Sequence, residues 1–145
     1  MSTPKDLTIE PPRSPRTRLG NYILLARAID KGRATLNSTN GEYHFDCPLD
    51  NYLFSFKGVK GADVKQLLAE GKSDEEIVRW FHTNGTPKTA EELTAWGAGV
   101  EGFLPYNDPE KKEWFIGECA NVGIDPKTST LFDFLETDDK LVAAK

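Results

Sequence analysis

The chain has 145 residues, of which 38% are hydrophobic, 10% aromatic and 28% charged, and its formal net charge is −5. This length suits one domain around a single core, and the aromatic content excludes an intrinsically disordered chain. No apolar stretch approaches the roughly 18 residues of a membrane span, and the beginning of the chain lacks the apolar segment of a secretion signal. Two cysteines are too few for a disulfide framework. We therefore expect a soluble, cytoplasmic protein with both thiols reduced.

The charge is unevenly distributed along the chain. Residues 1–36 contain seven Lys or Arg and three Asp or Glu, whereas residues 37–145 contain eleven and twenty. An acidic body disfavours nucleic acid as a partner, because that binding relies on neutralising phosphates. The basic first part can still attract a small anion.

Residues 1–18 contain four prolines and three arginines. Proline fixes φ and removes a backbone donor, so this segment is predicted to be an extended Pro/Arg-rich arm. The remaining residues, 19–145, are predicted to form a single helical domain. The sequence leaves open whether the arm packs on that domain or extends into solvent.

The first helix is predicted between residue 20 and about residue 36. There, apolar or small residues recur every three or four positions and share one helical face: Tyr22, Leu25, Ile29, Gly32 and Leu36. Charged side chains gather mostly on the other side, where Asp30 can pair with Arg27 or Arg33.

A turn is predicted next, because Asn40-Gly41 tolerates positive φ. Residues 42–45 then alternate between polar and apolar side chains. A small β-hairpin near residues 34–46 is therefore an option.

Further helices follow from apolar spacing and from start and stop signals. Pro48 suits a first helical position, and two capping boxes are expected, Ser73 with Glu76 and Thr89 with Glu92. The predicted helices cover residues 48–58, 64–71, 73–85, 89–103 and 109–123, with one or two further turns after residue 128. These patterns predict a mainly α fold, a compact bundle of about six short amphipathic helices.

Four segments between residues 12 and 50 are distinctive in combination. They are Pro-Arg-Ser-Pro-Arg at 12–16, Leu-Gly-Asn-Tyr at 19–22, Leu-Ala-Arg-Ala-Ile-Asp-Lys at 25–31 and Gly-Glu-Tyr-His-Phe-Asp-Cys-Pro-Leu-Asp at 41–50. Together they resemble the start of a bacterial family catalogued as a domain of unknown function, DUF 5069. The resemblance implies no reaction, ligand, cofactor or active site, but it draws attention to residues 12–50.

His44, Asp46, Cys47 and Asp50 form the densest cluster of reactive residue types. Cys47 precedes Pro48 and is expected at a helix N-terminus, where backbone N–H groups favour a thiolate. His44 can act as its base if the chain curls back. Asp46 and Asp50 oppose this, because nearby negative charge disfavours the thiolate. The alternatives are a ligand contact, or a small buried cysteine with a capping Asp46 and a partly buried His44.

Arg27, Asp30, Lys31 and Arg33 form a second cluster on the first predicted helix. Guanidinium groups bind a carboxylate or phosphate with two hydrogen bonds, so this face is a candidate anion site. The alternative is a solvated helix face whose ion pairs contribute little. Because the predicted turn lets the chain fold back, we expect Arg27, Lys31 and Arg33 to meet residues 44–50.

No metal or cofactor signature is present. His44, Asp46 and Cys47 lie too close in sequence to surround one tetrahedral ion, and no glycine-rich phosphate loop appears. Cys119 lies on an apolar helical face, where a thiol behaves as a small hydrophobic group. The aromatic residues at helical spacing are predicted to be core: Trp80, Phe81, Trp96, Phe103, Trp114 and Phe115.

Two classes of function remain open at this point. The leading hypothesis is a small non-enzymatic module that binds a small anionic ligand or a protein partner through the segment from Arg27 to Asp50. It rests on the absence of a catalytic set, a metal signature and a cofactor loop. The alternatives are a small enzyme or redox protein that uses Cys47 with His44, and an anion-binding domain that uses Arg27, Lys31 and Arg33.

Overall fold

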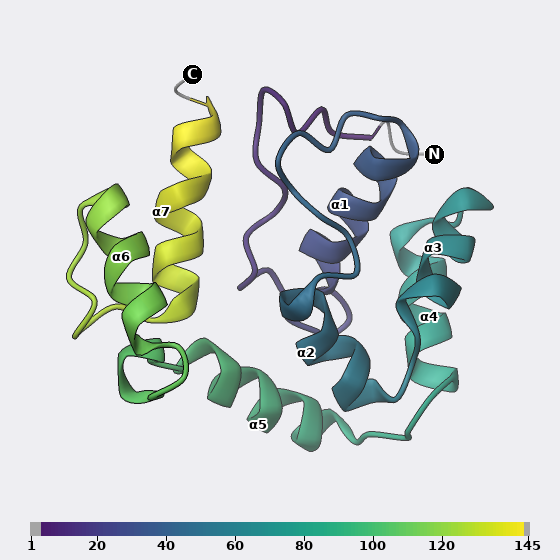
Figure 1. The fold of residues 1–145 in the computed structure, drawn as a ribbon. Helices are drawn as coiled ribbons and strands as arrows, with labels where there is room; N and C mark the ends of the chain where they lie inside the picture. Colours follow the sequence, from purple (N-terminus) through teal and green to yellow (C-terminus); the bar gives the residue numbers. More distant parts are fainter. Residues whose placement is uncertain (1–3, 144–145) are drawn as a thin grey trace.

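The computed structural model describes residues 4–143, and within them it is mainly helical and contains no strand (Figure 1). The elements are α1 (Leu25–Leu36), α2 (Pro48–Lys57), α3 (Gly61–Ala69), α4 (Asp74–Thr83), α5 (Ala90–Glu101), the 3₁₀-helix η1 (Pro105–Asn107), α6 (Lys112–Val122) and α7 (Leu131–Ala143). The mainly α prediction is confirmed. None of the described helices is long and apolar enough to cross a membrane.

Helix α1 occupies the centre of the arrangement. In Figure 1, α6 and α7 lie together on one side and α3 and α4 on the other, with α1 and α2 between them. Residues 22–32 are all buried. Gly32 permits close packing, since a Cβ there would lie 2.3 Å from Leu68 of α3 and 3.0 Å from the Phe45 ring.

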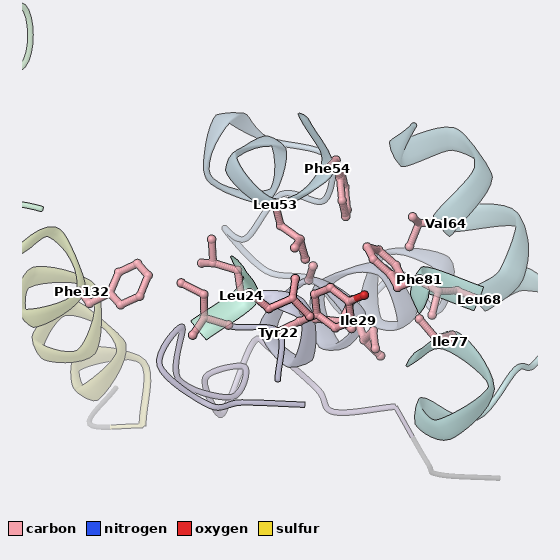
Figure 2. Packing of buried hydrophobic residues seen from close by; sticks show 14 of the residues in the cluster. Tyr22, Leu24, Ile29, Leu53, Phe54, Val64, Leu68, Ile77, Phe81 and Phe132 are labelled. Atoms are coloured by element: carbon pink, nitrogen blue, oxygen red, sulfur yellow. The ribbon is translucent and has the colours of Figure 1, made fainter. Parts of the chain in front are cut away.

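The main core forms where neighbouring helices meet α1 (Figure 2). Leu53 and Phe54 of α2 and Ile77 and Phe81 of α4 pack in the same cluster as Ile29 of α1. Buried side chains of this size contribute roughly 1.5–3 kcal/mol each relative to exposure. The hydrophobic effect thus fixes α1, α2 and α4 as one packed unit.

A smaller cluster joins α6 to α7. Phe115 and Cys119 of α6 pack against Phe134 of α7. Trp114 is 50% exposed, so the prediction that this aromatic residue is core is wrong. Its neighbour Phe115 faces inward because adjacent helical positions point in different directions.

Both predicted capping boxes are formed. The Ser73 side chain accepts from the Glu76 N–H while Glu76 accepts from the Ser73 N–H, and Thr89 pairs with Glu92 in the same way. A third reciprocal cap lies at the start of α7. There the Thr130 N–H donates to Asp133 and the Asp133 N–H donates to Thr130 Oγ1.

Two helix starts lie later than predicted. Helix α1 begins at Leu25 because Gly20, Asn21 and Leu24 have φ values of 59°, 70° and 68°, outside the helical region. Helix α6 begins at Lys112 because Asp108 closes a turn of its own, with its Oδ1 accepting from the Glu110 N–H. Helix α7 is longer than the one or two turns expected.

The optional hairpin near residues 34–46 is not formed. The Tyr43 N–H donates to the Asn40 carbonyl at 2.9 Å, and Asn40 Nδ2 donates back to the Tyr43 carbonyl at 2.8 Å. These bonds close a local turn, and residues 34–46 do not form the paired strands of a hairpin. The arm lies beside it, with the Leu7 N–H donating to the Thr39 carbonyl.

The Pro/Arg-rich arm packs on the body over the residues that the structure describes. Leu7, Pro12 and Pro15 are buried. Arg13 donates to both carboxylate oxygens of Asp30 in α1, and Arg16 pairs with Glu136 in α7. The arm therefore lies between α1 and α7, as the purple trace in Figure 1 shows.

Tyr22 makes the free energy of unfolding depend on pH in the alkaline range. Burial raises the pKa of its phenol from 10.0 to about 12, and its hydroxyl lies 3.0 Å from His82 Nδ1. Because the folded pKa is raised, this contribution is complete below pH 10 and is lost as pH rises through about 12. We expect the unfolding free energy, measured in urea at several pH values, to fall less steeply over this window in Tyr22→Phe. Identical slopes for the two proteins would contradict this assignment.

Candidate functional site

A cleft of about 850 Å³ opens between α1, α2 and α7. The arm and the turn at residues 41–44 border it, and residues just before and within α6 complete its wall. Its apolar lining includes Leu7, Leu49, Tyr52, Leu131, Leu135 and Leu141. A volume of this size is typical of clefts that take small molecules.

One polar group of the cleft joins α1 to α7. Arg27 donates through Nη1 and Nη2 to the two carboxylate oxygens of Asp139, at 2.7 and 3.0 Å. The Tyr43 hydroxyl donates to the same carboxylate at 2.9 Å. Burial and the Asp139 charge raise the pKa of Tyr43, so this phenol stays protonated.

A second polar group joins α1 to α2. The Lys31 ammonium lies 2.7 Å from Asp50 Oδ1 and donates to Cys47 Sγ at 3.3 Å. The other carboxylate oxygen of Asp50 accepts from the Asp46 N–H at 2.9 Å. Both Lys31 and Asp50 are buried, so each neutralises a charge that would be costly alone.

The N-terminus of α2 borders the cleft beside this group. Cys47 is the residue before the helix, Pro48 is its first residue, and the Cys47 side chain makes no capping hydrogen bond. Cys47, Pro48 and Leu49 all line the cleft. The N–H groups of a first helical turn lack intrahelical acceptors and carry partial positive charge.

One donor remains after these pairings. Arg27 Nε is buried and has no hydrogen-bond partner among residues 4–143. Lys31 donates to Cys47 Sγ and forms an ion pair with Asp50. Among the described residues, the unused donor is thus the Nε of Arg27.

Exposed charges at the cleft have both signs. Lys111 lines it together with the acidic Glu42, Glu110 and Asp138, and these three acidic residues are exposed. Water and salt screen exposed charges far more than buried ones. The two buried cations, Arg27 and Lys31, are each paired with a buried carboxylate, so they offer polar contacts in the cleft and little net charge.

The structure brings four of the sequence-predicted site residues to the cleft. Arg27, Lys31, His44 and Cys47 all line it. Asp50 lies behind Lys31 as its ion-pair partner. The expected meeting of the basic helix with residues 44–50 is thus formed by Lys31.

The other predicted pairings are wrong. Asp30 binds Arg13 of the arm rather than Arg27 or Arg33. Arg33 lies 2.9 Å from Asp74 of α4. Asp30 and Arg33 thus bind residues of other segments, which come close to α1 only when the chain folds. The solvated-face alternative is also wrong, because Arg27 and Lys31 are each 3% exposed.

The Asp46 carboxylate lies between the first turn of α2 and the start of α3. The φ of Asp46 is 61°, and its carboxylate accepts from Asn51 Nδ2 at 2.9 Å. A Cβ on Gly61 would lie 2.2 Å from this carboxylate, which therefore lies at the start of α3. A helix N-terminus stabilises negative charge there.

Tyr43 and Asp139 were not identified from the sequence. Tyr43 lies 96 residues and Arg27 lies 112 residues from Asp139 along the chain. Spacing carries no signal over such separations. The sequence does hold a signal for the start of the helix that carries Asp139: Thr130 and Asp133 are spaced as a variant of the capping box, which the predictions above did not use.

Cys47 has a different partner from the base that the enzyme hypothesis requires. No hydrogen bond within residues 4–143 joins His44 to Cys47, and Lys31 donates to the sulfur instead. His44 is exposed. Across the same residues, no group of three His, Cys, Asp or Glu side chains is placed to hold a metal ion.

Comparison with known proteins gives one assignment. The family described as a domain of unknown function, DUF5069, matches residues 9–141. The chain belongs to this family. The match extends well beyond the resemblance at residues 12–50 and covers the second half of the arm, α1 to α6 and α7 up to residue 141. A search of curated proteins found no match.

The two thiols of this DUF5069 member differ in surroundings. Both are free, with Cys47 half-buried at the cleft and Cys119 buried. Burial raises the pKa of the Cys119 thiol, which disfavours the reactive thiolate. We expect Cys47 to react with 5,5′-dithiobis(2-nitrobenzoate) at least about tenfold faster than Cys119 in native protein. Cys47→Ser and Cys119→Ser variants assign the two phases, and a faster Cys119 phase would contradict this placement.

Proposed function

We propose that this protein is a small-molecule-binding module whose ligand occupies the cleft between α1, α2 and α7. The observation that carries the proposal is the cleft of about 850 Å³ with its largely apolar lining. Ligand sites commonly combine apolar walls with a few polar groups that fix orientation. Here, Arg27 and Lys31 supply those groups from one face of α1.

Rigid positioning of these groups supports a binding role. Asp139 and Asp50 hold the two cations through short contacts. A group held in one orientation loses little conformational freedom when a ligand arrives, which favours affinity. The arrangement therefore suits recognition.

A second candidate is a thiol-dependent enzyme or redox protein. The contact between the Lys31 ammonium and Cys47 Sγ supports it, because a neighbouring cation stabilises a thiolate. It ranks below binding, since within residues 4–143 no hydrogen bond joins the sulfur to His44, the base that this candidate requires.

A reducing compartment such as the cytoplasm is also proposed, and the free state of both cysteines supports it.

The cleft is tested with a matched pair of leucines. Leu141 lines the cleft and is 46% exposed, whereas Leu36 lies outside it and is 44% exposed. Each lies in the last turn of its helix. A new carboxylate at Leu141 would have to be desolvated when an apolar ligand binds.

We expect the neutral fluorescent probe N-phenyl-1-naphthylamine to bind Leu141→Glu at least about fivefold more weakly than wild type. Leu36→Glu should bind it like wild type. Fluorescence titration measures both affinities, and thermal melting confirms that both variants fold. Equal affinity for the two variants, or no binding by wild type, would refute the proposal.

A further inference from the structure

We infer that the ligand of this cleft is an amphipathic cation, with an apolar tail inside the cleft and an amine or quaternary ammonium head at its acidic mouth. This inference rests on the proposed binding function and names the chemistry of the ligand. Two independent features carry it. They are the balance of charge around the cleft and a half-exposed tryptophan in its wall, Trp114.

The two cations inside the cleft have little net charge to offer a ligand. Arg27 binds both carboxylate oxygens of Asp139, and Lys31 lies 2.7 Å from Asp50 Oδ1. All four side chains are buried. An anionic head placed here gains little attraction, because the charge of each cation is largely cancelled by its partner. The interior of the cleft therefore suits an uncharged part of a ligand.

The mouth of the cleft is acidic. Glu42 before α2, Glu110 before α6 and Asp138 in α7 all line the cleft and are exposed. The side chains of Glu42 and Glu110 form no ion pair within residues 4–143. Lys111 and His44 are the basic residues that accompany them. Carboxylates from three elements thus surround the opening, and the charge of a cationic head complements them.

The charge of Asp138 also acts on the lining itself. Burial, the neighbouring Asp139 and Asp138 all raise the pKa of Tyr43, whose side chain is part of the cleft wall. A carboxylate that disfavours the negative phenolate at this place favours a positive group there.

Trp114 supplies an aromatic surface in the same cleft and does not depend on the acidic residues. It lies in the first turn of α6 and is 50% exposed, although its neighbour Phe115 is fully buried. Its ring meets the Phe134 ring of α7 edge-on, with 6.1 Å between the centroids, and this contact orients it. Indole rings attract ammonium groups. A ligand that covers the ring also removes apolar surface from water.

The tail follows from the apolar walls. Helix α7 contributes Leu131, Leu135 and Val142, which share one helical face along the cleft, and α2 contributes Leu49 and Tyr52. An apolar chain that enters from the mouth would lie between these two walls. Burial of its surface supplies affinity, and the head determines its orientation.

The chemistry of the head is tested with three ligands that share one tail. Decyltrimethylammonium, decan-1-ol and decanoate are titrated by calorimetry against the full chain, below the concentrations at which they aggregate. We expect the ammonium to bind at least about fivefold more tightly than the alcohol, and the carboxylate more weakly than both. The advantage of the ammonium should shrink in about 1 M NaCl, because salt screens exposed charges.

An ammonium that binds no better than the alcohol, or that does not bind, would overturn the inference. The neutral fluorescent probe then shows whether the cleft still binds an apolar ligand. If the probe fails to bind as well, the proposed function itself is overturned.

The position of the head is tested with a matched pair of glutamates. Glu110 and Glu113 are both exposed, and of the two only Glu110 lines the cleft. Replacing either one by Gln removes the same charge from the protein. We expect decyltrimethylammonium to bind Glu110→Gln at least about threefold more weakly than Glu113→Gln, whereas decan-1-ol should not distinguish the two variants. Melting temperatures show whether both are folded, and equal binding of the ammonium to the two folded variants would refute the placement of the head.

Two other occupants are distinguished by parallel measurements. A helical Leu/Lys peptide that binds where decyltrimethylammonium does not would assign the cleft to a basic segment of a partner protein. A dimer in light scattering that the neutral probe dissociates would assign the cleft to a second copy of this chain. Either result would overturn the inference.

Discussion

The structure depends on the need to pair the charges that α1 carries into the interior. Residues 22–32 are buried, yet this stretch includes Arg27, Asp30 and Lys31. An unpaired charge in such a place is strongly unfavourable, so each requires a partner. The partners come from three different elements. Arg27 meets Asp139 of α7, Lys31 meets Asp50 of α2, and Asp30 meets Arg13 of the arm.

Two of these pairs, those of Arg27 and Lys31, also border the cleft. The apolar contacts hold α1, α2 and α4 together and include Leu131 and Phe132 at the start of α7, whose Phe134 packs on α6. Further along α7, the bidentate contact between Arg27 and Asp139 links this helix to α1. Arg16 and Ser14 of the arm add contacts to Glu136. The space left between α2 and α7 is therefore bounded by polar links, with apolar side chains along its walls.

Local features were predictable from the sequence, and long-range partners were not. Ser73 with Glu76 formed the expected capping box because the two residues lie within one helical turn. Pro48 began α2 as predicted, because its ring restricts φ to a helical value. Spacing could not show that Arg27 would bind a carboxylate 112 residues away. The identification of Lys31 and Cys47 as candidate site residues came from residue type, whereas their contact needed the fold.

The most direct test of this account is a double-mutant cycle between Arg27 and Asp139. Unfolding free energies are measured for Arg27→Met, Asp139→Leu and the double variant, with Arg33→Met as a control at a less buried pair. If the pair supports the structure, each single variant loses about 3–5 kcal/mol, because an uncompensated charge remains buried. The double variant then loses much less than the sum of the two, since both charges are gone. Single losses below about 1 kcal/mol, or strictly additive losses, would contradict the central role of this pair.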